Sequence, residues 1–196
     1  MKKTAARIFT FILFSFYFMI LTSCVITFES RDYKNTYNKK SGNSNEYTIK
    51  DCPSEIAKLA FEYAKEYAAA DTEYVYGGQD PLRAIRIDCS GLVIMCYTYA
   101  LQGTDYKLIE PDMSSVYMYE NAATITTTPR QGDLIFMGDD SNDPSIYHIA
   151  VFDRFEGDQV YFIDSTSQGQ INGVSERHYA RTNKKIKAYG IMKLKS

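Results

Sequence analysis

The chain has 196 residues, of which 45% are hydrophobic and 23% charged. This balance suits one globular domain with an apolar core rather than a disordered segment. The formal net charge is −2 at pH 7, so a polyphosphate gains little from the field of the protein, and nucleic acid is excluded as a main partner. The chain has two histidines and no cysteine or histidine spacing typical of a metal site, so we expect no metal.

Residues 1–23 have the pattern of an export signal: residues 1–7 are basic, 8–21 are almost wholly apolar, and Leu21-Thr22-Ser23-Cys24 ends the run. The run is too short to predict a membrane span. Its end resembles the bacterial lipobox, whose cysteine is diacylated and becomes the first residue of the mature protein. The resemblance implies that a lipid on Cys24 anchors the protein to a membrane of the cell envelope, outside the cytoplasm. The alternative is an ordinary cleaved secretory peptide.

Residues 24–50 are rich in Ser, Asn, Lys and Tyr and have no sustained apolar period, which predicts a flexible tether behind the anchor. We expect the folded domain to span residues 51–196 and to act as a monomer. Asp51 or Cys52 is expected to cap a first helix that runs to about residue 70, with Pro53 in its first turn.

The rest of the chain predicts two more helices and a set of strands. Residues 73–78 resemble a short strand that ends in a double glycine, and Asp88 is expected to cap an apolar helix over 89–101. A shorter helix is expected over 114–120. Short apolar runs then predict strands at residues 133–137, 147–153, 159–164 and 185–192. Helices followed by antiparallel strands indicate an α+β domain, with the N-terminal helices packed on a mainly antiparallel sheet.

Cys89 is the candidate nucleophile because it lies in the first turn of the predicted apolar helix. The free amide groups and the positive end of the helix dipole favour a thiolate there. A purely structural cysteine is the alternative. Cys96 lies among apolar residues and is expected to be a buried thiol. A disulfide between Cys52 and Cys96 is compatible with an oxidising compartment, but nothing in the sequence requires it.

A cysteine nucleophile needs a base within hydrogen-bond reach, and His148 is the candidate because it begins a predicted apolar strand. His178 lies in a polar stretch and is expected at the surface. Residues 155–157 predict a three-residue hairpin loop with Gly157 in the left-handed conformation. Counting outward from this loop places His148 opposite Asp164, with Cβ atoms about 5 Å apart. A carboxylate there can orient the imidazole, although Asp164 can also be read as a turn residue at a strand end.

Three motifs in order resemble the NlpC/P60 family of cell-wall cysteine peptidases, which share a papain-like α+β fold. The resemblance covers about residues 56–192. The motifs are Tyr74-Val75-Tyr76-Gly77-Gly78, then Asp88-Cys89-Ser90-Gly91-Leu92-Val93, and then Gln131-Gly132-Asp133-Leu134-Ile135-Phe136 followed by His148-Ile149-Ala150-Val151-Phe152.

The resemblance implies Cys89 as nucleophile, His148 as base and Asp164 at a third polar position that is most often histidine in the family. It implies that Tyr74 lines the site near the oxyanion. It also implies that Asp88 and Ser90 flank the nucleophile and contact either the substrate or the local structure. The segment 79–87 is somewhat long for the family, and its arginines, Arg83 and Arg86, are read either as a solvated loop or as contacts to a substrate carboxylate.

The implied activity is hydrolysis of peptidoglycan stem peptides through a thioester, commonly at the bond between γ-D-glutamate and a diamino acid, with no cofactor. One alternative keeps the fold but changes the reaction to a cell-wall amidase or an acyltransferase. The other is a non-catalytic lipoprotein that binds wall fragments or a partner protein.

Overall fold

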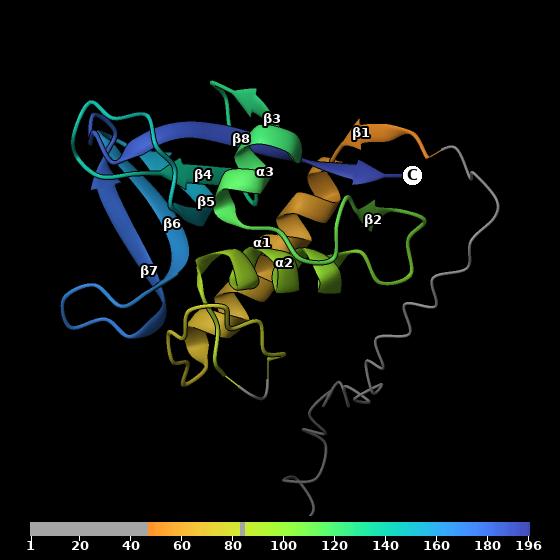
Figure 1. The fold of residues 1–196 in the computed structure, drawn as a ribbon, viewed down its shortest axis with the longest axis horizontal. Helices are drawn as coiled ribbons and strands as arrows, with labels where there is room; N and C mark the ends of the chain where they lie inside the picture. Colours follow the sequence, from red (N-terminus) through yellow and green to blue (C-terminus); the bar gives the residue numbers. More distant parts are fainter. Residues whose placement is uncertain (1–46, 83–84) are drawn as a thin grey trace, which may run out of the picture. The chain divides into compact units, whose positions relative to one another are not determined.

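The computed structural model describes residues 47–82 and 85–196 (Figure 1). The signal segment, Cys24 and Arg83 lie outside these residues. Within them are the helices α1 (Ser54–Ala69), α2 (Cys89–Ala100) and α3 (Ser115–Asn121). The strands are β1 (Ile49–Asp51), β2 (Lys107–Leu108), β3 (Ala123–Thr126), β4 (Leu134–Met137), β5 (His148–Glu156), β6 (Gln159–Thr166), β7 (Gly173–Ala180) and β8 (Ile186–Lys195). Across the described ranges, no helix is both long and apolar enough to cross a membrane.

The strands form one sheet in the order β1-β8-β4-β5-β6-β7, and β2 and β3 also pair with β8. Each of these pairings is antiparallel. The helices come early in the chain and the long strands late, so the predicted α+β class and the mainly antiparallel sheet are confirmed.

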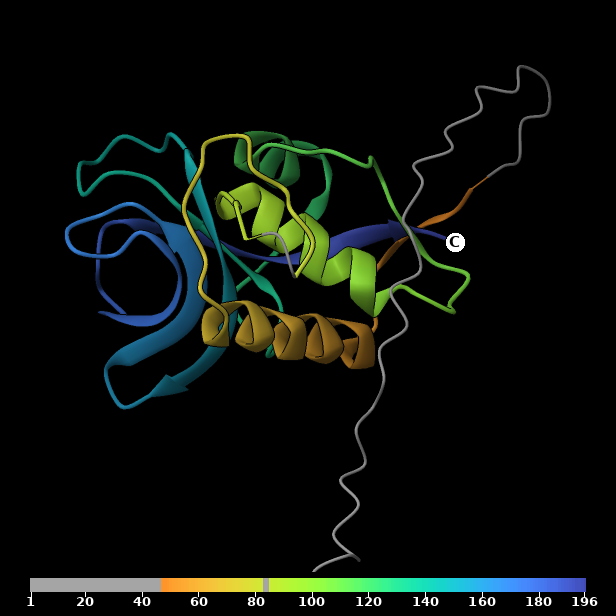
Figure 2. The ribbon, with the colours of Figure 1, turned by 90° about the horizontal axis from the view of Figure 1, so that it is seen from below.

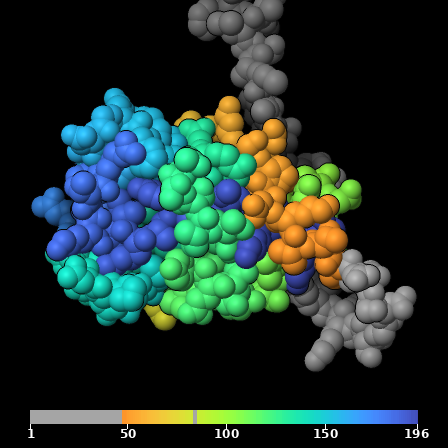
Figure 3. Space-filling model, turned by 90° about the horizontal axis from the view of Figure 1, so that it is seen from above, coloured from red at the N-terminus to blue at the C-terminus, as the bar shows by residue number. Residues whose placement is uncertain are grey.

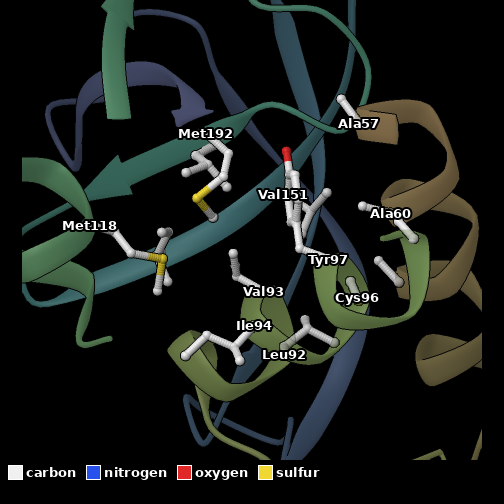
Figure 4. Packing of buried hydrophobic residues seen from close by; sticks show 14 of the residues in the cluster. Ala57, Ala60, Leu92, Val93, Ile94, Cys96, Tyr97, Met118, Val151 and Met192 are labelled. Carbon is white, nitrogen blue, oxygen red and sulfur yellow. The ribbon is translucent and has the colours of Figure 1, made fainter. Parts of the chain in front are cut away.

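The main core lies where α1 and α2, which run side by side in Figure 2, pack against one face of the sheet. α2 has buried apolar side chains on most of its circumference, which is typical of a helix enclosed by other elements. Figure 4 shows them between α1, α3 and the strands, and the hydroxyl of Tyr97 donates to the carbonyl of Gly132 at 2.9 Å. Cys96 is fully buried there, as predicted. Helix α2, which begins at Cys89, is therefore held firmly by its own apolar residues.

The start of α1 differs from the prediction. Its N-cap is Pro53, with no side-chain cap, so the prediction that Asp51 or Cys52 caps this helix is wrong. Asp51 instead ends β1, and its carboxylate accepts a hydrogen bond from the hydroxyl of Thr124 at 2.6 Å. Figure 3 shows this segment, in orange, against the green residues of α3 and β3. β1 pairs with β8, so regular structure begins two residues before the expected start of the domain.

Two further elements differ from the prediction. Residues 73–78 form no strand, and a single isolated bridge, between Glu73 and Arg86, involves them. The polar stretch around His178 belongs to a full strand, β7, which pairs with β6 along its whole length. His178 itself is exposed, as predicted, and its ring lies 5.3 Å from that of Tyr161.

The strands β4, β5 and β6 bury apolar side chains on both faces of the sheet. One face meets the helices, and the other holds a second apolar cluster that includes Ala150, Phe152 and Phe162. Because side chains alternate along a strand, His148 shares its face with Ala150, and Asp164 shares its face with Phe162. His148 and Asp164 therefore lie on the face of the sheet that holds the second apolar cluster, next to its members Ala150 and Phe162.

Candidate active site

Asp88 fixes the start of α2, where Cys89 is the first helical residue. One carboxylate oxygen accepts a hydrogen bond from the backbone N–H of Gly91 at 2.7 Å, as an N-cap does. The other oxygen accepts from the N–H of Gly77 at 2.8 Å, and the hydroxyl of Ser90 donates to the first at 3.0 Å. Asp88 and Ser90 thus hold the local structure around the candidate nucleophile, and Asp88 joins the double-glycine loop to the helix.

The same loop presses closely on the first turn of α2. A Cβ atom added at Gly91 would lie 2.1 Å from the carbonyl oxygen of Gly78, so any side chain larger than hydrogen would push the loop away. On the opposite side, the hydroxyl of Ser165 donates to the carbonyl of Ile87 at 2.7 Å. The start of α2 is therefore fixed to the loop and to the strand that carries Asp164.

Tyr74 lies beside the candidate nucleophile. Partial burial raises the pKa of its hydroxyl, and the neighbouring Cys89 and Asp88 raise it further. The phenol therefore keeps its proton at neutral pH and can donate a hydrogen bond. Tyr76, two residues later, is 90% exposed and points away from the protein interior.

His148 and Asp164 meet, but in a different register from the one predicted. The hairpin has a two-residue loop rather than a three-residue one, because Glu156 pairs with Gln159, and Gly157 has the expected positive φ of 56°. This loop alone moves the register three residues from the predicted one, and a bulge at Asp153 moves it back by one, which leaves a difference of two. Continued past its last pair, the register places Asp164 across from Ala150 rather than His148.

A shift of two residues keeps both side chains on the same face of the sheet, so they are diagonal neighbours. Nε2 of His148 lies 2.7 Å from Oδ2 of Asp164, whose side chain is fully buried. Since the carboxylate can only accept, Nε2 carries the proton and Nδ1 is the nitrogen left to serve Cys89.

The surroundings of His148 favour its charged form. Burial lowers the pKa of the imidazole, but hydrogen bonds with Asp164 and Cys89 and the charges of both groups outweigh burial and raise it to about 9. At neutral pH the ring is therefore an imidazolium. The group can therefore give a proton to a leaving amine.

Arg177 on β7 is the member of this cluster that sequence reasoning missed. Its Nη1 donates to Oδ2 of Asp164 at 2.9 Å, and only 13% of its side chain is exposed. The pairing of β6 with β7 places Arg177 directly opposite Phe162, on the same face as Asp164. The available signal was the turn-rich segment 167–172, which ends at Gly173 and returns the chain antiparallel to β6.

A model of the NlpC/P60 family matches residues 71–188, more than half of the chain, and this range includes Cys89, His148, Asp164 and Arg177. The chain belongs to the NlpC/P60 family. The predicted papain-like α+β fold of this family is thereby confirmed.

Two solved structures resemble this NlpC/P60 chain. The crystal structure of Ly7917 with the hydrolyzing product of MDP is 12% identical over 69% of this chain and 62% of that one, with a TM-score of 0.47. The crystal structure of Ly7917 is 11% identical over 71% and 62%, with a TM-score of 0.44. The chain thus spans less than two thirds of the Ly7917 chain. No curated protein matches it.

The segment 79–87, which leads to the candidate nucleophile, is held at Asp80. The guanidinium of Arg86 in this segment donates to the carboxylate of Asp80 at 3.1 Å and remains mostly exposed. The hydroxyl of Tyr67 on α1 also holds the segment by donating to the carbonyl of Asp80 at 2.8 Å. These contacts agree with the reading of Arg86 as part of a solvated loop.

Alkylation should distinguish Cys89 from the other two described thiols of this NlpC/P60 domain. Burial raises the pKa of Cys52 to about 12 and that of Cys96 well above its usual range, so both stay protonated at neutral pH. Cys89 is 7% exposed, against 1% for Cys52 and 0% for Cys96. We expect iodoacetamide to label Cys89 first in the native chain, as measured by peptide mass spectrometry. Equal rates in the native chain, and not only in denaturant, would contradict a reactive role for Cys89.

Proposed function

We propose that the chain is a cysteine peptidase that hydrolyses peptide bonds in the stem peptides of peptidoglycan, with Cys89 as nucleophile, His148 as base and Asp164 as the group that orients the base. The observation that carries the proposal is the hydrogen-bonded pair of His148 and Asp164 beside a cysteine at a helix N-terminus, in a chain of the NlpC/P60 family. Nucleophile, base and orienting group in this order form the arrangement that nucleophilic amide hydrolysis requires.

In the proposed reaction, the sulfur of Cys89 bonds to the carbonyl carbon of the scissile amide, and the electron pair of the carbonyl moves to its oxygen. Tyr74 stands near this oxygen as a donor. The C–N bond then breaks as His148 gives its proton to the leaving amine, which leaves a thioester on Cys89. Water attacks the thioester, His148 takes the proton of the water, and the thiolate departs from the released acid.

Within this proposal the favoured bond is the one between γ-D-glutamate and a diamino acid, the bond that the family resemblance implies. An amidase that separates sugar from peptide, or an acyltransferase, would use the same cysteine and histidine. A non-catalytic wall-binding lipoprotein would need neither the buried Asp164 nor its hydrogen bond to His148, and this contact favours an enzyme.

Mass spectrometry of digested wall fragments tests the proposal. The full chain and its Cys89→Ala variant are incubated separately with purified peptidoglycan, and the new termini are identified. The proposed endopeptidase leaves a free amine on the diamino acid, whereas an amidase leaves a free carboxyl group on the sugar and a free peptide N-terminus. New termini that form equally with the Cys89→Ala variant, or with neither protein, would overturn the proposed function.

We further propose that a lipid on Cys24 anchors the protein to a membrane of the cell envelope. The support is the apolar run that ends in a lipobox and is followed by a polar segment. Cys24→Ala should move the protein from the membrane fraction to the soluble or unprocessed pool, which fractionation and immunoblotting would measure. A signal-cleaved Cys24→Ala protein that still sediments with membranes would contradict the anchor.

A further inference from the structure

The carboxylate of Asp164 has two hydrogen-bond donors, and both use the same oxygen. Nε2 of His148 lies 2.7 Å from Oδ2, and Nη1 of Arg177 lies 2.9 Å from it. The second oxygen, Oδ1, is buried and has no hydrogen-bond partner among the described residues. Asp164 is fully buried, so the carboxylate depends on these two cations for its stability and its orientation.

The guanidinium of Arg177 is also held by groups other than Asp164. Its Nη2 donates to the hydroxyl of Tyr179 on the same strand, so the two ends of the guanidinium bind different groups. The guanidinium also lies over two aromatic rings, 5.7 Å from the centre of Phe162 and 5.2 Å from the centre of Tyr179. These contacts fix the plane of the guanidinium, and with it the direction in which Nη1 meets Asp164.

We propose that Arg177 is a positioning residue of the active site. It fixes the carboxylate of Asp164, and this carboxylate in turn fixes the ring of His148. No hydrogen bond joins Arg177 to His148 or to Cys89 within the part of the chain that the structure describes. Arg177 therefore acts through Asp164 and does not touch the reacting atoms. This inference rests on the proposed function of Cys89 and His148, and it adds a fourth residue, from β7, to that site.

The geometry also predicts the electrostatic effect of Arg177. The groups that act on His148 are Cys89 from α2 and Asp164 from β6, with Arg177 from β7 behind Asp164. Arg177 and the imidazolium are two cations that share one carboxylate oxygen, so the guanidinium weakens the attraction of Asp164 for the proton of His148. Removing Arg177 should raise the pKa of His148, whereas removing the charge of Asp164 should lower it.

The kinetic test compares Arg177→Met, Arg177→Lys and the control Arg154→Met in the full chain. Arg154 also pairs with carboxylates and lies over a tyrosine ring, but it does so on β5, with Asp153 and Glu156. We expect Arg177→Met to lower kcat by about tenfold or more, Arg177→Lys to keep part of kcat, and Arg154→Met to keep all of it. Because Arg177 acts through Asp164, adding Arg177→Met to Asp164→Asn should lower kcat little further. If the fold-reductions in kcat of Arg177→Met and Asp164→Asn multiply in the double variant, the two residues act independently and the inference is wrong.

A second readout separates this inference from the proposed function. In a His178→Ala background His148 is the only histidine, so its titration can be followed by NMR in the full chain without any substrate. The pKa of His148 should be higher in Arg177→Met than in the parent and lower in Asp164→Asn. If the His178→Ala protein and the unmutated chain both lack hydrolytic activity, the proposed function is wrong. The titration of His148 still tests the contact between Arg177 and Asp164 in that case. If the pKa of His148 is the same in Arg177→Met and Arg177→Lys as in the unmutated protein, Arg177 does not have the proposed role. If Arg177→Met does not fold, Arg177→Lys alone gives the test.

Discussion

Replacing Cys89 with alanine should abolish hydrolysis of wall peptides while leaving the fold intact. The substitution removes the atom that forms the thioester, and the loss of a covalent nucleophile lowers kcat by at least about a thousandfold in enzymes of this type. The small side chain of Cys89 is the first of α2, and the position of this helix depends on Asp88 and on the apolar residues that follow. Release of soluble fragments from purified peptidoglycan measures the effect.

Cys96→Ala is the matched control for Cys89→Ala. It removes a thiol from the same helix, but one that is fully buried between α1 and α2. It should cost some stability and leave kcat unchanged at a temperature where the variant is folded. A Cys89→Ala chain that still hydrolyses at a tenth of the parent rate would show that another group attacks the bond.

Asp164→Ala should lower both turnover and stability. The substitution frees the imidazole from its orienting partner, and we expect kcat to fall by about a hundredfold or more. It also leaves Arg177 buried without its carboxylate, and breaking a buried pair in this way costs about 3–5 kcal/mol of unfolding free energy. Asp164→Asn keeps the shape and one acceptor oxygen for both donors, so its losses should be smaller. Kinetics together with thermal unfolding separate the two effects.

The pH dependence of hydrolysis by the same variants shows whether Asp164 raises or lowers the pKa of His148. The raised pKa of His148 keeps the ring protonated up to about pH 9, and above that pH it can no longer give a proton to the leaving amine. The alkaline limb of kcat/KM should therefore lie near pH 9 in the parent. In Asp164→Asn the carboxylate charge is gone, and the limb should move toward the ordinary histidine value of about 6.5. An alkaline limb that does not move would contradict the role of Asp164.

The two histidines provide a further control. His148→Ala should remove activity as completely as Cys89→Ala, whereas His178→Ala should retain it because His178 is exposed and stacks on Tyr161. Loss of activity in His178→Ala, with activity retained in His148→Ala, would reverse the assignment of the base.

Features that depend on neighbours in the sequence were predictable. The Asp88 cap, the buried thiol of Cys96 and the positive φ of Gly157 each follow from a few adjacent residues, and the structure shows all three. The meeting of His148 with Asp164 was also predicted, although for an incomplete reason. Period-two alternation fixed the face of each side chain, and an error of two positions leaves that face unchanged.

Features that depend on distant partners were not predictable from local patterns. β1 is exposed along its whole length and has no apolar alternation, and its backbone pairs with β8, near the other end of the chain. The residues around Asp153 give no sequence signal of a bulge, and this bulge changes the register of the hairpin. Arg177 was missed because an arginine in a polar stretch looks like a surface residue until the partner strand and its buried carboxylate are known.

The position of β8 determines when the sheet can be completed during synthesis of the chain. This last strand pairs with β1, β2, β3 and β4, and Ser196 exchanges backbone hydrogen bonds with Thr48. A chain that emerges from its N-terminus presents Cys89 first, then His148 and Asp164, and only at the end the strand that closes the sheet beside β4. The sheet cannot close before β8 is made, because the strands that β8 pairs with are distant from it in sequence. Cys89 is therefore synthesised before the strand that completes the sheet, and the sheet that carries His148 and Asp164 is completed only once β8 has been made.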